Sequence, residues 1–203
     1  MKKIILLTFL LFGLNNTNAQ DLSYGALLGF NAYDVQIDGP ISANSGFSGL
    51  NFGGFLEYQL NNNFGVKGNL LYSSVVEDNF ITGSTSTFDG KLIDELKVNS
   101  LQIHGLLKYD VNSEYNKGFY LIGGFRMTNV LSAKADGEET EGFYKKSNFG
   151  AMLGFGVNFA HHFGLELLPE INLTNTLDSE TNKTRNFGGY INFTINLESI
   201  INK

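Results

Sequence analysis

A strict alternation of apolar and small residues constrains the fold of this chain more than any other feature. From Phe149 to Phe159 every odd-numbered residue is apolar, and the residues between them are Gly, Met or Asn. Because a β-strand turns successive side chains to opposite faces, this segment has one apolar face and one small, polar face. The pattern recurs about eight times, each time over roughly ten residues, the length of a tilted membrane-crossing strand. The sequence therefore predicts an all-β fold that closes into an eight-stranded transmembrane β-barrel.

The alternation assigns a range to each strand of an antiparallel up-and-down barrel. In the seventh strand, Pro169 has no N–H group to donate to a neighbour, so we expect a bulge or distorted pairing there. The predicted strand ranges are 22–31, 50–58, 64–73, 101–109, 119–127, 149–159, 163–173 and 187–197.

The connections between these strands alternate in length. The short ones are Asn61–Asn63, a slightly longer turn at 112–116, and 160–162. Short periplasmic turns opposite long outer loops are typical of bacterial outer-membrane barrels. An even number of strands then places both ends of the barrel on the short-turn side. The long, polar connections are predicted at 33–45, 75–95, 132–146 and 175–185.

The first twenty residues have the pattern of a secretory signal peptide. Met1-Lys2-Lys3 is followed by an apolar run to Leu14 and by a polar segment that leads to Ala19. This apolar run is too short to cross roughly 30 Å of hydrocarbon as a helix. We expect residues 1–19 to be removed by cleavage after Ala19, and residues 20–203 to form one barrel domain in the outer membrane.

Composition and charge exclude several kinds of site and partner. The chain has no Cys, so neither disulfides nor thiolate metal sites contribute to it. Its mean hydropathy is close to zero, as expected when only alternate residues face lipid. The net charge of −6, without a basic stripe, argues against a nucleic-acid partner. We expect outer-membrane lipid around the barrel, and a monomer.

A soluble, exported ligand-binding barrel of the lipocalin type is the alternative fold. It also alternates, but it turns its apolar face inward and its polar face to water. A solvated outer face is rich in Lys and Glu, whereas the polar face here is mainly Gly, Asn and Ser. Such residues suit the narrow interior of an eight-stranded barrel. Aromatic residues also gather at the strand ends, where membrane girdles lie, and these are Tyr58, Phe64, Tyr109, Phe119, Phe163 and Phe187.

Several short segments resemble the PorT-like outer-membrane β-barrel family of Bacteroidota-type bacteria, within the OmpA/OmpX-like class of small barrels. They are Phe64–Val66, Lys117–Leu121, Tyr144–Gly150 and Phe163–Glu166. The resemblance covers the chain after the leader and implies an outer-membrane barrel. It also implies that some relatives assist protein secretion or gliding machinery. In one departure, residues 198–203 follow the last predicted strand, where many outer-membrane barrels end on an aromatic residue.

Charged side chains on the predicted inward face are the candidate site. Buried charges are tolerated only when they are paired and hydrogen-bonded. The favoured interpretation is a structural network of cations against carboxylates that plugs the barrel and fixes the strand register. The alternative is a narrow or gated pore in which the charged groups exchange partners. The candidate residues are Glu57, Lys67, His104, Lys108, Arg126, Glu166 and Glu170.

The sequence indicates no enzyme, metal site or cofactor. Glu166 and Glu170 share a strand face at about 13 Å, too far apart to act as a carboxylate pair on one bond. His104 has no nucleophile beside it in its strand. His161-His162 in a tight turn and the acidic run at 136–141 are interpreted as solvated segments.

These expectations predict only a broad class of function. The leading hypothesis is a non-enzymatic barrel whose long outer loops contact a protein or another surface ligand, because binding usually resides on loops held by a rigid scaffold. A narrow small-solute channel and a soluble ligand-binding barrel are the two alternatives.

Overall fold

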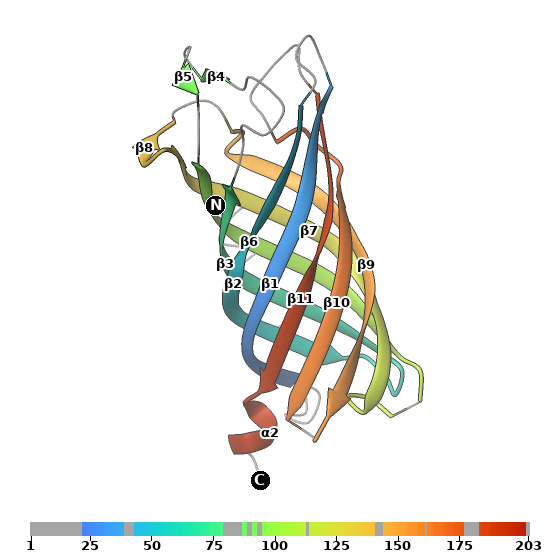
Figure 1. The fold of residues 1–203 in the computed structure, drawn as a ribbon. Helices are drawn as coiled ribbons and strands as arrows, with labels where there is room; N and C mark the ends of the chain where they lie inside the picture. The colour runs from blue at the N-terminus through green and yellow to red at the C-terminus, as the bar shows by residue number, and fades with distance from the viewer. Residues whose placement is uncertain are drawn as a thin grey trace, which may run out of the picture.

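The structure, a computed structural model, describes residues 22–38, 43–78, 87–88, 91–92, 95–112, 114–140, 144–160, 162–176 and 183–201. The expected leader at 1–19 lies outside these residues. Within them, no helix is long and apolar enough to cross a membrane. The only helix that the described residues contain is the four-residue α2 (Glu198–Ile201), which follows the last strand. Figure 1 shows α2 at one end of the barrel and three two-residue strands at the other.

The described residues form a closed barrel of eight long strands. Each strand is antiparallel to its neighbours, and β1 pairs with β11 to close the ring in the order β1, β2, β3, β6, β7, β9, β10, β11. This confirms the predicted fold class. Its strands are β1 (Leu22–Asp38), β2 (Ala43–Gln59), β3 (Phe64–Asp78), β6 (Glu95–Asp110), β7 (Gly118–Ala135), β9 (Ser147–Phe159), β10 (Phe163–Asn172) and β11 (Lys183–Asn196). The short strands are β4 (Thr87–Phe88), β5 (Lys91–Leu92) and β8 (Glu138–Glu139).

The apolar face of the barrel points outward. Leu153 is 74% exposed and Phe125 is 65% exposed, whereas inward Asn51 and His104 are fully buried. A lipocalin-like barrel requires the opposite arrangement, so that alternative is wrong. Phe64 packs against Tyr109 with ring centroids 4.9 Å apart on the short-turn side. The outward surface is therefore suited to lipid, with aromatic rings near its edge.

Five strands continue for at least five residues past the apolar band at the end opposite the short turns, here called the long-loop end. The first small or polar outward residues beyond the band are Ala32, Ser48, Ser74, Asn99 and Asn129. Counting these residues, each of the five strands continues for five to seven residues, about 16 to 23 Å along the strand. We call residues 32–38, 43–48, 74–78, 95–99 and 129–135 the long-loop wall.

The wall corrects the predicted loops. Residues 33–38 and 43–45 are strand, so only 39–42 separates β1 from β2. The predicted loops at 75–95, 132–146 and 175–185 likewise begin or end in strand. The sequence marked these ranges as loops because their outward side chains are mostly polar, although inward side chains such as Val35, Val75 and Ala133 are apolar.

The pairing has one irregularity at the predicted proline and one that the sequence did not indicate. Pro169 pairs with Gly189 on β11, but the ladder to β9 is interrupted at 168–169 and resumes at Glu170 in the same register. There is distorted pairing at Pro169 and no bulge. A register shift between Asn99 and Ser100 of β6 makes Leu131 the additional residue on β7.

Candidate functional site

All seven candidate residues lie inside the barrel and are buried. Their strands carry them inward because each occupies the small, polar phase of the alternation. Six of the seven form ion pairs, and these pairs belong to two separate groups.

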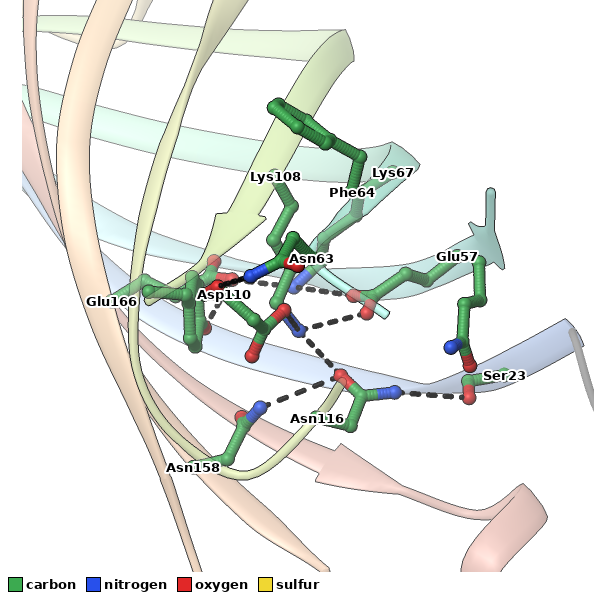
Figure 2. Close-up of polar contacts among 12 residues, drawn as sticks. Ser23, Glu57, Asn63, Phe64, Lys67, Lys108, Asp110, Asn116, Asn158 and Glu166 are labelled. Atoms are coloured by element: carbon green, nitrogen blue, oxygen red, sulfur yellow. Dashed lines mark hydrogen bonds and ion pairs between the residues drawn. The ribbon is translucent and has the colours of Figure 1, made fainter. Parts of the chain in front are cut away.

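The first group lies at the short-turn end. Lys108 Nζ is 2.9 Å from Glu57 Oε1, and Lys67 Nζ is 2.5 Å from Glu166 Oε1. Lys67 Nζ also approaches Glu57 Oε2 at 4.0 Å, and Lys108 Nζ lies 3.6 Å from Asp110. Figure 2 shows these side chains converging from β2, β3, β6 and β10. The group thus joins strands on several sides of the ring.

Two side chains of this group were absent from the sequence prediction. Asp110 is fully buried, although it is the last residue of β6. Tyr120 donates a hydrogen bond to Glu166 at 2.9 Å, and its ring lies 4.2 Å below Lys108 Nζ. The inward phase of both residues was the available signal, but a strand end and an aromatic side chain were not treated as parts of a charge network.

The second group centres on Arg126 of β7. Its Nε donates to Glu170 Oε2 at 2.6 Å, and its other nitrogens donate to Thr128, Asn148 and Asn172. Glu170 and Asn172 belong to β10, and Asn148 to β9. The guanidinium group is therefore held by neighbours on three adjacent strands, a geometry that keeps it in one place.

His104 takes no part in either group. Both of its ring nitrogens are buried without a hydrogen-bond partner in the part of the chain that the structure describes. The ring packs edge-on against Tyr190, with centroids 5.3 Å apart, and faces Arg126 across the β6–β7 ladder.

An apolar cluster separates the two groups of charges. On β10, Leu168 lies between Glu166 and Glu170, and on β7, Ile122 lies between Tyr120 and Arg126. Tyr190 at its far side donates to Gln102 at 3.1 Å. These inward apolar residues are the exceptions to the alternation, and the fold gathers them together. The lumen cluster comprises Leu106, Tyr120, Ile122, Met152, Leu168 and Tyr190.

Little space remains inside the barrel. Among the described residues, a cavity of about 40 Å³ adjoins Arg126 and Tyr190, and one of about 30 Å³ adjoins Glu57 and Asn158. Each is large enough for a few water molecules. Two charge groups, with an apolar cluster between them, therefore lie along the lumen.

The long-loop wall has an apolar core of its own, here called the wall cluster. Tyr33, Val130 and Tyr144 pack against it, and burial raises the pKa of the Tyr144 hydroxyl, so this ring stays neutral. The core faces the inside of the barrel, where the five extended strands surround it. The wall cluster consists of Val35, Phe47, Val75, Leu96, Val98, Ala133 and Ala135.

A Ser–His contact lies at the short-turn end of the barrel. His162 Nδ1 lies 2.7 Å from Ser199 Oγ, but the same hydroxyl also bonds the Asn196 carbonyl at 3.0 Å. The contact ties α2 to the turn before β10. His161 lies outside the described residues, as do parts of the acidic run at 136–141. Among the residues that are described, no group of three acidic or histidine side chains is placed to hold a metal ion.

Comparison with known proteins gives one family match. Residues 18–178 match the family described as "Outer membrane protein beta-barrel domain". No curated protein matches the chain. Among the solved structures that resemble it in fold are two bacterial surface proteins. One is Ail, the attachment invasion locus protein of Yersinia pestis, which was solved in complex with the heparin analogue sucrose octasulfate. Its TM-score is 0.50 and its sequence identity 14%, and the match covers 87% of this chain and 99% of Ail. Neisserial surface protein A has a TM-score of 0.55 and 11% identity, covering 84% of this chain and 96% of that protein.

Proposed function

The chain belongs to the outer membrane protein β-barrel domain family, and we propose that it is a non-enzymatic barrel that contacts other molecules at its long-loop end. The observation that carries the proposal is the long-loop wall. Five strands extend beyond the apolar band around an apolar core, which holds their outward residues on a rigid support.

The filled lumen supports a structural role for the inward charges. A solute would have to displace the Arg126–Glu170 pair, the lumen cluster and the lysine–carboxylate group in turn. Breaking a buried pair costs about 3–5 kcal/mol, so we propose that these residues plug the barrel and fix its register. The narrow channel is the competing function.

Three finer features belong to the same proposal. The family places the protein in the outer membrane. We propose that residues 1–19 direct its export and are cleaved after Ala19, that residues 20–203 act as one monomeric domain, and that the barrel is PorT-like. The segments Lys117–Leu121 and Tyr144–Gly150 support the last point.

The exposed charges of the wall indicate what kind of ligand suits it. Asp34 and Glu95 are exposed on β1 and β6, and Glu138 and Glu139 are exposed on the adjoining β7–β8 hairpin. Ail is solved with a sulfated sugar analogue. Among the described residues of this end, these four exposed carboxylates outnumber the exposed cations, Lys146 and Arg185, and repel sulfate groups, so we propose an uncharged or basic partner for this chain.

A shortened wall tests the proposal. Ala32 and Ser48 are partners across the β1–β2 ladder, so residues 33–47 can be replaced by an Asn-Gly turn that joins the strands directly. Proteoliposomes with either chain are assayed for binding to neutral glycans, sucrose octasulfate and basic and acidic proteins. We expect a neutral or basic ligand to bind the full wall at least tenfold more tightly than the shortened one.

The control is Glu114→Ala, an exposed change at the short-turn end. It is expected to bind like the unaltered chain. Equal binding by the shortened wall contradicts the proposal. Ion conductance of the unaltered chain in planar bilayers supports the channel instead.

A further inference from the structure

The β6–β7 turn (residues 111–112 and 114–117) reaches across the mouth of the barrel at the short-turn end. Asn116 Nδ2 donates to Ser23 Oγ of β1 at 3.3 Å, and its Oδ1 accepts from Asn158 Nδ2 of β9 at 3.4 Å and from Lys108 Nζ of β6. In the ring of eight strands, β1 lies four strands from β7 in either direction. The bond to Ser23 therefore joins opposite sides of the barrel (Figure 2).

Tyr115, the residue before Asn116, also places its aromatic ring in the mouth of the barrel. Lys108 Nζ lies 4.7 Å from the centre of the Tyr115 ring. A Cβ atom on Gly65 of β3 would collide with the Tyr115 hydroxyl, so glycine is required for the ring to enter. Burial, and then the negative charge of Glu57, raise the pKa of Tyr115, which keeps its hydroxyl neutral.

The backbone of the turn favours this inward course. Asn116 has φ of 60° and Gly118 has φ of 75°, the left-handed region that Asn and Gly adopt most readily. The Asn61–Asn63 turn is different, since Asn61 Oδ1 accepts from the N–H groups of Asn63 and Phe64 within the same turn. The β6–β7 turn instead bonds to the opposite wall of the barrel, through Ser23.

We propose that the β6–β7 turn is a built-in plug that seals the lumen from the short-turn end. Behind it lies the cavity of about 30 Å³, whose lining includes Ser23, Glu57, Lys67, Asn158 and Thr194. The proposal goes beyond a filled lumen, because it assigns the seal at this end to one connection between strands. The lysine–carboxylate group is reached by solutes only when the turn withdraws.

A single cysteine reports on the seal, because the chain has none of its own. Thr194 is buried, lines the cavity and is not a partner of Asn116, so Thr194→Cys places a thiol of similar size behind the turn. The purified full barrel in micelles is treated with a small, charged methanethiosulfonate reagent, and the rate of modification is followed by mass spectrometry.

Two single substitutions are designed to open the seal, and one double variant is the control for changes elsewhere in the same turn. Asn116→Gly removes the three side-chain contacts while glycine keeps the positive φ. Tyr115→Ala removes the ring without changing the backbone. Glu114→Ala with Lys117→Ala deletes only the exposed ion pair of the same turn, whose two side chains are 64% and 60% exposed.

We expect modification of the reporter to accelerate at least tenfold with Asn116→Gly or Tyr115→Ala, and to be unchanged in the control. Each variant is compared only where its gel mobility still changes on boiling, which shows that the barrel is folded. Fast modification of the reporter with the turn intact overturns the proposal. So does slow modification in both opened variants. Neither result affects the proposed binding at the opposite end.

Discussion

At the scale of single residues, the lumen depends on complementary partners. Arg126 has four polar partners and is buried, and Glu170 is 4% exposed beside it. A carboxylate in such a place is stable only while its cation remains, because the few water molecules that the adjoining cavity can hold solvate it far less than bulk water does. The arrangement places a large free-energy cost on removing one partner alone.

Arg126→Ala should therefore lower the free energy of unfolding by about 3–5 kcal/mol. Denaturant titration of the barrel in lipid vesicles measures this difference. The double variant Arg126→Met with Glu170→Leu removes both charges and is expected to lose much less. An unchanged unfolding midpoint for Arg126→Ala would rule out a structural role for the pair.

Two glycines of opposite orientation give a second prediction. A methyl group on inward Gly29 would meet the side-chain oxygens of Asn51 and Asn192, whereas nothing lies within 4 Å of one on outward Gly105. Gly29→Ala should cost about 1–3 kcal/mol through overpacking. Gly105→Ala should change stability by less than about 0.5 kcal/mol. The same vesicle titration measures both, and equal losses would contradict a crowded lumen.

Residue positions were largely predictable, but their partners were not. The phase of the alternation correctly placed all seven candidate side chains inward. Lys67, however, bonds to Glu166, 99 residues later in the chain. Which inward residues meet across a barrel depends on the tilt and stagger of its strands, and the alternation carries no information on either.

At the scale of elements, the long-loop wall shows how one strand can serve two environments. On β1, even-numbered residues such as Leu28 and Phe30 are apolar and face outward. Past Ala32 the apolar residues are odd-numbered, with Tyr33 and Val35 inside. The apolar phase reverses where lipid gives way to water. This reversal was the signal for the wall, and it was mistaken for the end of the strand.

Val75 and Val76 form a matched pair for testing the wall. Val75 is 3% exposed in the wall cluster, and Val76 follows it on the opposite face of β3. Val75→Asp should open the wall, because an unpaired carboxylate is costly in an apolar core. Limited proteolysis should then cut within the wall while the membrane-embedded part stays folded. Val76→Asp should leave the digestion pattern unchanged, and equal cutting in both would contradict the role of the cluster.

The bulge on β7 explains why its wall segment was missed. Inward residues of β7 are even-numbered up to Thr128, but beyond Leu131 the buried ones are Ala133 and Ala135. One additional residue exchanges the two faces of a strand. A fixed period cannot be followed through such a point, so sequence patterning ended the strand too early.

At the scale of the whole molecule, the outward face determines the solvent that the protein requires. Leu, Phe and Ile side chains are exposed around the complete ring of strands. Water does not solvate such a surface without aggregation, whereas detergent or lipid does. The barrel and its medium therefore form one folding unit.

Residues 20–203 should accordingly fold only with detergent or lipid present. Semi-native gels should show one mobility before boiling and another after it, since the closed barrel resists unfolding by detergent at room temperature. Circular dichroism of the same samples should show β-structure only in micelles or vesicles. A stable, monomeric β-protein in plain buffer would contradict the outward placement of the apolar face.

The ion pairs that cross the lumen also bear on how the barrel is completed. Lys67 and Arg126 lie on strands β3 and β7, but the carboxylates that they hydrogen-bond, Glu166 and Glu170, arrive later, on β10. A chain interrupted before β10 would hold two buried cations with no counter-charge from that strand. Strands that joined in a shifted register would misplace the same carboxylates. The charges thus act as a check on correct assembly, satisfied only when the penultimate strand is in its proper position.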